Sequence, residues 1–267
     1  MIDLAASITS STITTALLYP IERLKIEIQL DKDNESVAKS FDSIMTKQGV
    51  PGFYQGLSPL IIGNAFAYGI YFVAYEKLKI IIQPNQQSMM SIAQCSGLAG
   101  IIGSLMTNPF YVLQTRQSKE NKPLVALTRK LIKDEGVWTL WKGIAASLIL
   151  VSNPIIQFVV YEHLKKRLGK GGKQLSSLLI FLIGAISKIV ATIFTYPYTL
   201  LRTRQQSKKA DKNLSLTEIF KDICEKESFL GVFKGLGPKL IQTTLNSAIL
   251  LMIYEKIRAL LMSRLSK

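Results

Sequence analysis

The stretch LLYPIERLKIEIQ, residues 17–29, places a proline and a cluster of charges at the end of an apolar segment. No charged residue occurs from Leu4 to Ile21, and four charged side chains follow Pro20 within seven positions. A helix needs about 20 apolar residues to cross the hydrocarbon core of a bilayer. The run that ends at Pro20 is therefore long enough to be a membrane span.

Further uncharged stretches follow along the chain. They cover residues 56–75, 80–115, 143–161, 174–201 with Lys188 as the one interruption, and 240–254. Apolar helices in the core of a soluble protein seldom lack charge for so long, so a soluble all-helical protein fits poorly. The sequence predicts an all-α membrane protein with six transmembrane helices.

The composition narrows the function classes. The net charge is +15, yet 48% of the residues are hydrophobic, and the lysines lie in loops between the apolar runs. A basic nucleic-acid-binding protein would gather its lysines on one polar face, so we expect no nucleic-acid partner. Cys95, Cys224 and His163 lack the spacing of a metal site, and we expect no metal. The beginning of the chain resembles neither a signal peptide nor an Arg-rich transit peptide.

Three motifs each occur three times in the same order. The first contains Pro20, Pro109 and Pro197, spaced 89 and 88 residues apart. The second reads QGVPGFYQG (48–56), EGVWTLWKG (135–143) and ESFLGVFKG (227–235), and the third reads YEKLK (75–79), YEHLK (161–165) and YEKIR (254–258). Repetition at a fixed period outweighs other signals of fold.

We therefore expect one domain, 1–267, made of three repeats at 1–84, 85–172 and 173–267. Each repeat is predicted to hold a helix that ends at the proline motif, a basic loop with a short helix, and a second long helix. Prolines remove a backbone donor and bend helices, so all three are expected to mark kinks. Such repeats predict pseudo-threefold symmetry around a central cavity.

Together these motifs resemble the mitochondrial carrier family of solute transporters, over essentially the whole chain. The stretches 147–168, 175–197 and 231–257 resemble its peroxisomal branch. The resemblance implies a transporter, not an enzyme, that exchanges ATP, ADP, AMP, coenzyme A, NAD or FAD by alternating access. It implies a multi-pass protein of the peroxisomal membrane, with the mitochondrial inner membrane as the alternative. We expect a monomer that requires no cofactor, with membrane lipid and the transported compound as its partners.

The resemblance also implies two gates built from charged residues. On the inner side, the acid of one repeat pairs with the base of the next, but the family pattern is incomplete in this chain: the pairs would be Glu22–Gln114, Tyr111–Arg202 and Thr199–Lys25. Glu27 stands where the family more often has a basic residue. The expected inner-gate residues are Glu22, Lys25, Gln29, Gln114 and Arg202.

The cytosolic gate is complete in the sequence. Each YExxK/R motif supplies an acid and a base, so three ion pairs can form between repeats. One motif alone would be an ordinary interfacial charge cluster, but three matched copies favour a gate. The predicted pairs are Glu76–Lys165, Glu162–Arg258 and Glu255–Lys79.

The substrate is expected to meet polar and cationic residues inside the spans. Lys188 lies within the fifth uncharged run, where a lysine is costly unless it meets water or an anion. Lys239 lies at the start of the sixth, where a snorkelling interfacial lysine is an equal alternative. Family spacing adds an apolar pair, Ile149 and Leu150, for an adenine ring. The remaining candidates are polar: Asn64, Asn153, Gln157, Gln242, Thr243 and Asn246.

The sequence leaves two other functions open. A carrier of keto acids or amino acids would usually carry a cationic contact on the fourth span, where Ile149 and Leu150 stand. A scaffold on the same fold would have no need of Lys188 within a span. Neither reading explains the sequence as well as a nucleotide carrier.

Overall fold

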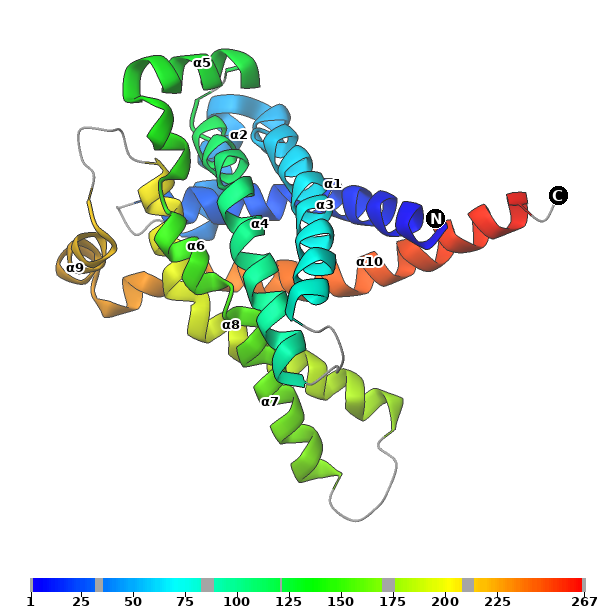
Figure 1. Cartoon of the computed structure of the whole chain (residues 1–267). Helices are drawn as coiled ribbons and strands as arrows, with labels where there is room; N and C mark the ends of the chain where they lie inside the picture. Colours follow the sequence, from blue (N-terminus) through cyan, green and yellow to red (C-terminus); the bar gives the residue numbers. More distant parts are fainter. Residues whose placement is uncertain are drawn as a thin grey trace. The chain divides into compact units, whose positions relative to one another are not determined.

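The computed structural model describes residues 2–31, 36–82, 89–120, 122–169, 176–207 and 214–265. Every regular element in these ranges is a helix. In order along the chain (Figure 1), they are α1 (Ile2–Leu30), α2 (Val37–Gly52), α3 (Leu57–Ile82), α4 (Met89–Gln117), α5 (Leu124–Glu135), η1 (Val137–Trp141), α6 (Ile144–Leu150), α7 (Asn153–Leu168), α8 (Ser177–Ser207), α9 (Leu216–Glu227), η2 (Phe229–Phe233) and α10 (Leu236–Leu265).

The helices follow one pattern three times: a long helix, a short helix, then a second long helix. In the second repeat that closing helix is divided, because α6 ends at Leu150 and α7 begins at Asn153. Pro154 lies in the first turn of α7, and its missing N–H cannot bond to the carbonyl four residues earlier. The uncharged run 143–161 is thus shared between two helical segments.

The helices that carry the proline motif do not end there, so that prediction is wrong. Each proline lies inside a helix that continues for another eight to ten residues, ending at Leu30, Gln117 and Ser207 respectively. A proline inside a spanning helix is tolerated where neighbouring groups satisfy the backbone carbonyl that it leaves unbonded. The charged residues after each proline are consequently held on a helix.

One such neighbouring group is visible in α4. Pro109 has no N–H for the carbonyl of Leu105, four residues earlier, and the indole Nε1 of Trp141 donates to that oxygen at 3.0 Å. Trp141 is the second of the two tryptophans in EGVWTLWKG (135–143), the copy of the second motif in repeat two. The motif therefore stabilises the proline-containing helix of its own repeat.

Replacing Trp141 with phenylalanine is expected to lower the free energy of unfolding by about 1–2 kcal/mol, because the Leu105 carbonyl loses its donor. The check is thermal unfolding of the purified protein in detergent. Trp138→Phe is the matched control, since Trp138 is 84% exposed in the described structure. Equal shifts for the two variants would contradict the role of the indole.

Three helical segments among the described residues are long and apolar enough to cross a membrane. They are Leu57–Ile82, Val137–Leu168 and Leu178–Ser207. The helices α1, α4 and α10 are as long, at 29, 29 and 30 residues, but carry more polar groups. Many of those groups are hydroxyls that bond to a carbonyl of their own helix, such as Thr14 to Ser10 and Thr107 to Gly103, both at 2.7 Å.

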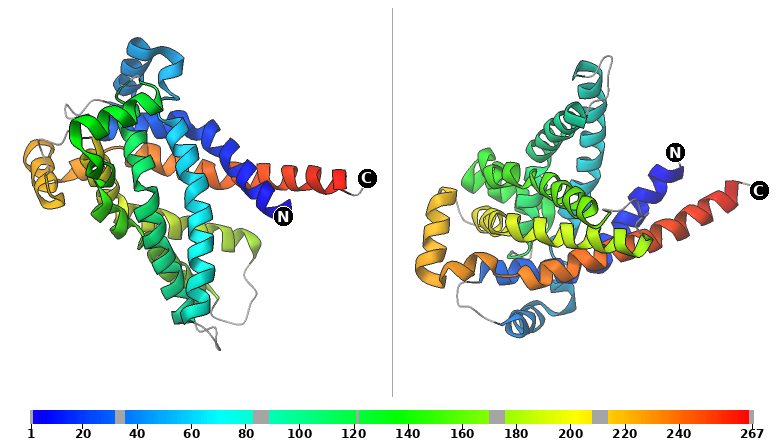
Figure 2. Two further views of the ribbon diagram at one scale, coloured as in Figure 1. Left: turned by 45° about the horizontal axis from the view of Figure 1, so that its top comes forward. Right: turned by 90° about the horizontal axis from the view of Figure 1, so that it is seen from below.

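The chain divides into two compact units. Unit 1 comprises residues 1–65, 110–140 and 234–267, and unit 2 comprises 66–109 and 141–233. In unit 1, α1 and α10 run side by side although they begin and end the chain (Figure 2). In unit 2, α8 packs against α6 and α7 and contacts α9 and η2.

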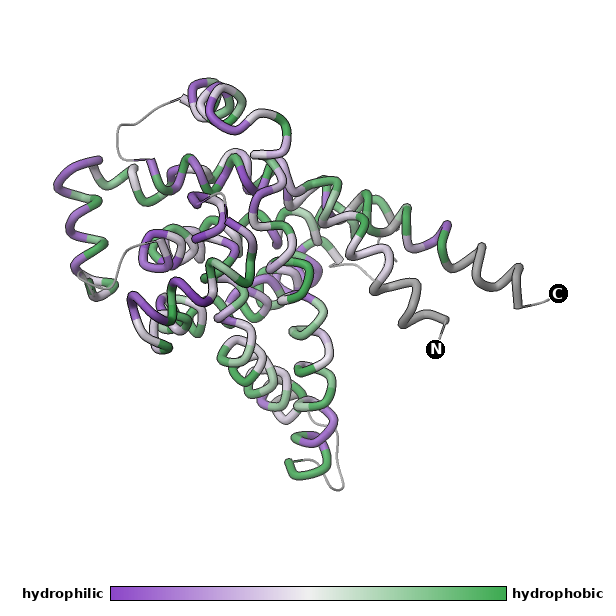
Figure 3. The backbone as a smooth tube through the Cα atoms, turned by 90° about the horizontal axis from the view of Figure 1, so that it is seen from above, coloured by the Kyte–Doolittle hydropathy of each residue, from purple (hydrophilic) through white to green (hydrophobic). Residues whose placement is uncertain are grey.

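The short helix α9 shows why these connecting segments fold. Its apolar face buries Ile219 and Ile223 against Leu200, Leu201 and Val232. Its other face is hydrophilic, as the alternating colours of α9 in Figure 3 show. The helix begins with a capping box, in which the hydroxyl and backbone amide of Ser215 exchange hydrogen bonds with Glu218. Those bonds lower the pKa of the Glu218 carboxyl.

Two glycines of the second motif allow close helix approach. Gly56 and Gly143 both have positive φ, at 93° and 78°. A Cβ on Gly56 would lie 2.5 Å from the Tyr19 hydroxyl, and one on Gly143 would lie 3.0 Å from the side chain of Gln206. A larger residue would therefore strain the backbone and push the neighbouring helix away.

Candidate functional site

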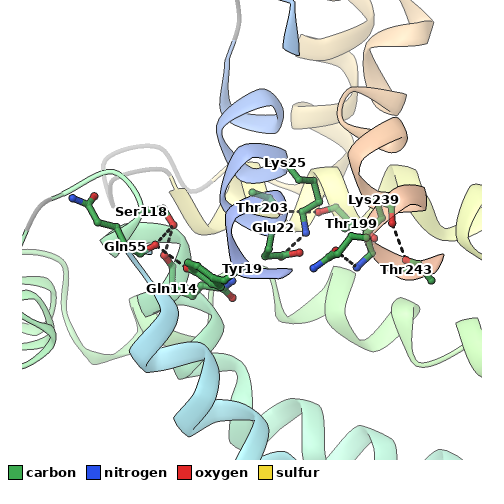
Figure 4. Close-up of polar contacts among 11 residues, drawn as sticks. Tyr19, Glu22, Lys25, Gln55, Gln114, Ser118, Thr199, Thr203, Lys239 and Thr243 are labelled. Carbon is green, nitrogen blue, oxygen red and sulfur yellow. Dashed lines mark hydrogen bonds and ion pairs between the residues drawn. The ribbon is translucent and has the colours of Figure 1, made fainter. Parts of the chain in front are cut away.

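Four of the predicted site residues lie together in unit 1. The ammonium of Lys25 is 2.5 Å from the carboxylate of Glu22, three residues earlier on α1. On α10, the ammonium of Lys239 donates to the side-chain oxygen of Gln242 at 3.2 Å. The side chains of Lys239 and Gln242 both lie near the Glu22 carboxylate. Figure 4 shows Glu22, Lys25 and Lys239 in this region.

The partner of Glu22 differs from the one expected. The family order predicts Glu22 with Gln114, whereas the structure pairs Glu22 with Lys25 on its own helix. A base three residues after an acid reaches it along one helix face. Gln114 lies instead beside Tyr19 (Figure 4).

Other polar residues of unit 1 make contacts that do not include Glu22 or Lys25. The Tyr19 hydroxyl donates to the carbonyl of Gln55 at 2.7 Å, which ties α1 to the turn before α3. The Tyr111 hydroxyl lies 3.4 Å from the side-chain oxygen of Asn64. The Thr243 hydroxyl donates to the carbonyl of Lys239 within α10, and Asn246 is exposed.

In unit 2, two predicted residues meet. The ammonium of Lys188, on α8, donates to the side-chain oxygen of Asn153 at 3.0 Å. The amide nitrogen of Asn153 in turn donates to the hydroxyl of Thr195 at 2.8 Å. Asn153 begins α7, directly after the break between α6 and α7, so the break brings its side chain to α8. We call Lys188, Asn153 and Thr195 the lysine triad.

The apolar pair lies at the other side of the same break. Ile149 and Leu150 are the last residues of α6, and Ile149 is 38% exposed. The Ser152 hydroxyl donates to the carbonyl of Ile149 at 2.7 Å, which closes the end of α6. Gln157, one turn into α7, is half-buried.

The remaining inner-gate residues are largely shielded from solvent. Gln29 is fully buried at 0% exposure on α1, in unit 1. Arg202 is half-buried on α8, in unit 2. Whether these residues form a gate remains a prediction.

The cytosolic gate also remains a prediction. Glu76 and Lys165 are both described and both exposed, and no ion pair joins them. Lys165 lies 5.7 Å from the ring centre of Tyr161 on its own helix. The side chain of Arg258, the expected partner of Glu162, lies outside the described residues. Glu255 is exposed, and Lys79 is half-buried.

Sequence reasoning missed a set of charge pairs that hold the short helices. Arg204 on α8 makes a two-bond contact with Glu227 at the end of α9, at 2.5 and 2.8 Å, with both side chains buried. Arg116 on α4 pairs with Glu135 at the end of α5 at 2.9 Å. The signal was present in the sequence: each arginine lies seven residues after its proline, and each glutamate opens the second motif.

The first repeat departs from this arrangement. The two equivalent positions hold Glu27 and Gln48. The Glu27 carboxylate bonds to Arg23 at 2.6 Å, and Arg23 also donates to the carbonyl of Ser118 at 2.6 Å. Arg23 is 1% exposed. In the first repeat, Arg23 thus precedes Glu27 on the same helix. Arg23 connects α1 to the second repeat through Ser118, whereas the arginines of the other two repeats connect to a short helix.

In the described part of the chain, no group of three or more His, Cys, Asp or Glu side chains could hold a metal ion.

Comparisons with known proteins agree with the repeated helical pattern. A model of the family "Mitochondrial carrier protein" matches three times, over residues 1–86, 85–172 and 173–265. The chain is 28% identical to peroxisomal membrane protein PMP34 of Mus musculus, an alignment that covers 97% of this chain and 92% of the relative. It is 28% identical to a peroxisomal nicotinamide adenine dinucleotide carrier of Arabidopsis thaliana, covering 92% and 91%. It is 25% identical to the mitochondrial FAD carrier protein FLX1 of Saccharomyces cerevisiae, covering 96% of both.

A family model that matches nearly every residue, in three tandem copies, accounts for the three long–short–long repeats. Carriers of this family move small molecules across membranes and are not enzymes. The chain therefore belongs to the mitochondrial carrier family and is a multi-pass membrane transporter with six transmembrane helices in three repeats.

Proposed function

We propose that this carrier exchanges adenine nucleotides or nucleotide-containing cofactors by alternating access. The observation that carries the proposal is the lysine triad. Lys188 lies within an otherwise uncharged span, and its ammonium donates to Asn153 at 3.0 Å. Ionisable residues inside spans commonly serve a substrate pathway because burial there is costly.

The partners of Lys188 support an anionic substrate. Asn153 is neutral, so this hydrogen bond orients the ammonium and adds no negative charge beside it, and Thr195 holds the amide of Asn153 in turn. An ammonium is a compact, strongly hydrated charge. Phosphate oxygens can take the place of the water molecules around it. Relatives named for NAD and FAD, both of which contain an adenine nucleotide, support the same substrate class.

An adenine ring requires an apolar surface as well as a cation. Ile149 and Leu150 end α6 a few residues before Asn153, which begins α7 on the opposite side of the break between the two helices. We propose that this pair contacts the base while Lys188 holds a phosphate. Lys239, Gln242, Thr243, Asn64, Gln157 and Asn246 are the proposed polar contacts elsewhere along the path.

The proposed cycle needs a gate on each side of the site. Glu22, Lys25, Gln29, Gln114 and Arg202 are the proposed inner gate. The three acid–base pairs of the YExxK/R motifs are the proposed cytosolic gate, and the exposed Glu76 and Lys165 are free to pair when that side closes. Binding energy from the substrate would shift the population between the two open states.

We propose the peroxisomal membrane as the location, with the mitochondrial inner membrane as the alternative, and a monomer as the working unit. Two of the relatives named above are peroxisomal, and one is mitochondrial. Expression of the tagged chain with markers of the two organelles distinguishes these locations.

The runner-up is a carrier of keto acids or amino acids, and a non-transporting scaffold is the third possibility. The two transport functions require different side chains on the fourth span. Keto acids and amino acids require a cation there, whereas an adenine ring requires an apolar pair. Ile149 and Leu150 therefore favour a substrate with an adenine ring.

Ligand-induced stabilisation tests the substrate class. The purified protein is heated in detergent with a thiol-reactive dye, for which the fully buried Cys95 reports unfolding. A ligand that binds the native state raises the unfolding temperature. ATP, ADP, AMP, coenzyme A, NAD and FAD are compared with a dicarboxylate, a keto acid and an amino acid. Stabilisation by at least one adenine compound is expected. Stabilisation by a keto acid or amino acid alone would contradict the proposal.

A further inference from the structure

The three tyrosines of α3 lie on one face of that helix. Tyr68, Tyr71 and Tyr75 are separated by three and four residues, and Lys79 follows four residues after Tyr75. Because an α-helix has 3.6 residues per turn, residues three or four apart lie one above the other. We call Tyr68, Tyr71 and Tyr75 the tyrosine face. It belongs to unit 2, as does the lysine triad.

The opposite face of α3 has a different character. It carries Phe66, Val73 and Ile80, which are all more than half exposed. Seven residues make about two turns, so these three side chains also share a face, and Phe66 lies about half a turn from Tyr68. Exposed apolar side chains on a spanning helix suit contact with lipid tails. The tyrosine face is therefore directed away from the side of α3 that suits lipid.

The tyrosine hydroxyls need polar surroundings in the middle of the span. Tyr68 and Tyr71 are the twelfth and fifteenth of the 26 residues of α3, and they are 59% and 40% exposed. Neither hydroxyl hydrogen-bonds to another of the described residues. A hydroxyl without a partner is costly in hydrocarbon, and tyrosines that face lipid gather at the ends of spans. The tyrosine face is therefore suited to the solute path, where water or a ligand supplies the partners.

The rings of the tyrosine face offer a stacking surface. Tyr71 and Tyr75 are stacked, with ring centres 6.1 Å apart and ring planes inclined by 13°. The face of a tyrosine ring is electron-rich, so it attracts cationic or electron-poor planar groups. The nicotinamide ring of NAD⁺ is a pyridinium cation, and the flavin ring of FAD is electron-poor. Either ring suits a tyrosine surface better than the purely apolar pair Ile149 and Leu150.

We propose that the tyrosine face is a second ring-binding subsite of this carrier. It takes the nicotinamide or flavin ring of a dinucleotide cofactor, while Ile149 and Leu150 contact the adenine ring and Lys188 holds a phosphate. This inference rests on the proposed function, since it places the second ring of a substrate whose first ring and phosphate that function assigns. It makes dinucleotide cofactors the preferred members of the proposed substrate class.

The test compares the affinities of NAD⁺, FAD and AMP for the full chain in detergent, using the thiol-reactive unfolding assay. AMP contains the adenine ring and one phosphate but no second ring. Tyr71→Leu is expected to weaken the binding of NAD⁺ and FAD about tenfold, because the stacking partner is lost. Its affinity for AMP is expected to stay within about twofold of wild type, because the substituted side chain contacts no part of AMP.

Three further variants make this result specific. Tyr71→Phe keeps the ring and is expected to retain most of the affinity for both dinucleotides. Phe66→Leu is the matched control, because it removes an exposed aromatic ring from the opposite face of α3, and it is expected to leave all three affinities unchanged. Tyr68→Leu is expected to weaken NAD⁺ and FAD binding as Tyr71→Leu does, and it keeps the question answerable should Tyr71→Leu fail to fold.

Three results would overturn the second subsite. The first is unchanged dinucleotide affinity in the folded Tyr71→Leu or Tyr68→Leu protein. The second is a loss for AMP as large as that for NAD⁺ and FAD. The third is a loss in Tyr71→Phe as large as that in Tyr71→Leu, because the hydroxyl and not the ring would then hold the ligand.

FMN carries the flavin ring and one phosphate but no adenine, so it separates this inference from the proposed function. If FMN stabilises the wild type, adenine compounds do not, and Tyr71→Leu abolishes the effect of FMN, the subsite stands and the proposed substrate class fails. If the wild type binds AMP but neither NAD⁺ nor FAD, the substrate class stands and the subsite fails. If none of these compounds binds the wild type, both fail.

Discussion

Replacing Lys188 with alanine is expected to reduce nucleotide exchange at subsaturating substrate by roughly ten- to hundredfold. The variant loses a charge-assisted contact to the substrate, which is worth about 1.5–3 kcal/mol. The side-chain oxygen of Asn153 also loses the hydrogen bond that it accepts from Lys188 at 3.0 Å. The measurement is the initial rate of labelled ATP uptake into proteoliposomes.

Two variants make this result specific. Lys188→Arg keeps the charge and is expected to retain more activity than Lys188→Ala. Lys226→Ala removes a lysine whose side chain is 62% exposed, and it is expected to leave the exchange rate unchanged. A Lys188→Ala protein that exchanges at the wild-type rate would remove the lysine triad from the substrate pathway.

Replacing Glu227 with alanine is expected to destabilise the carrier by about 3–5 kcal/mol, since it leaves the Arg204 guanidinium buried without its carboxylate. Both side chains of this pair are less than 10% exposed, and the contact has two bonds, at 2.5 and 2.8 Å. For a chain of this size the unfolding temperature should fall by about 10 °C. The measurement is thermal unfolding in detergent.

The neighbouring pair Lys226–Asp222 is the control, because it is exposed and lies on the same helix, α9. Asp222→Asn is expected to change the free energy of unfolding by less than about 1 kcal/mol. Replacing both Arg204 and Glu227 with methionine is expected to recover much of the loss, because neither charge of this buried pair then remains. A double variant as unstable as Glu227→Ala would show that the charge imbalance is not the cause.

Much of the fold could be predicted from the sequence. The lengths of the uncharged runs and the period of the three motifs are enough to predict six spans in three repeats, and the family matches confirm them. The ends of the helices were harder to predict. Proline is a helix breaker in isolation, so the continuation of α4 past Pro109 could not be inferred. It depends on a tertiary donor, Trp141, that lies 32 residues further along the chain.

The candidate site was predictable in part. A lysine in an uncharged run identified Lys188, and polar residues on the fourth span identified Asn153, which the structure brings together. Thr195 gave no signal, because one threonine in a span with several is unremarkable. The partner of Glu22 was missed because family order favours a partner on the next repeat, whereas a lysine three residues away is closer.

Counter-exchange of ATP tests the central claim most directly. Proteoliposomes holding the purified carrier are preloaded in turn with AMP, ADP, coenzyme A, NAD, FAD, a dicarboxylate or nothing, and uptake of labelled ATP is measured. Uptake is expected only when an adenine nucleotide or cofactor is inside. No ATP uptake under any internal load, with uptake of a keto acid or amino acid by the same vesicles, would contradict a nucleotide exchanger.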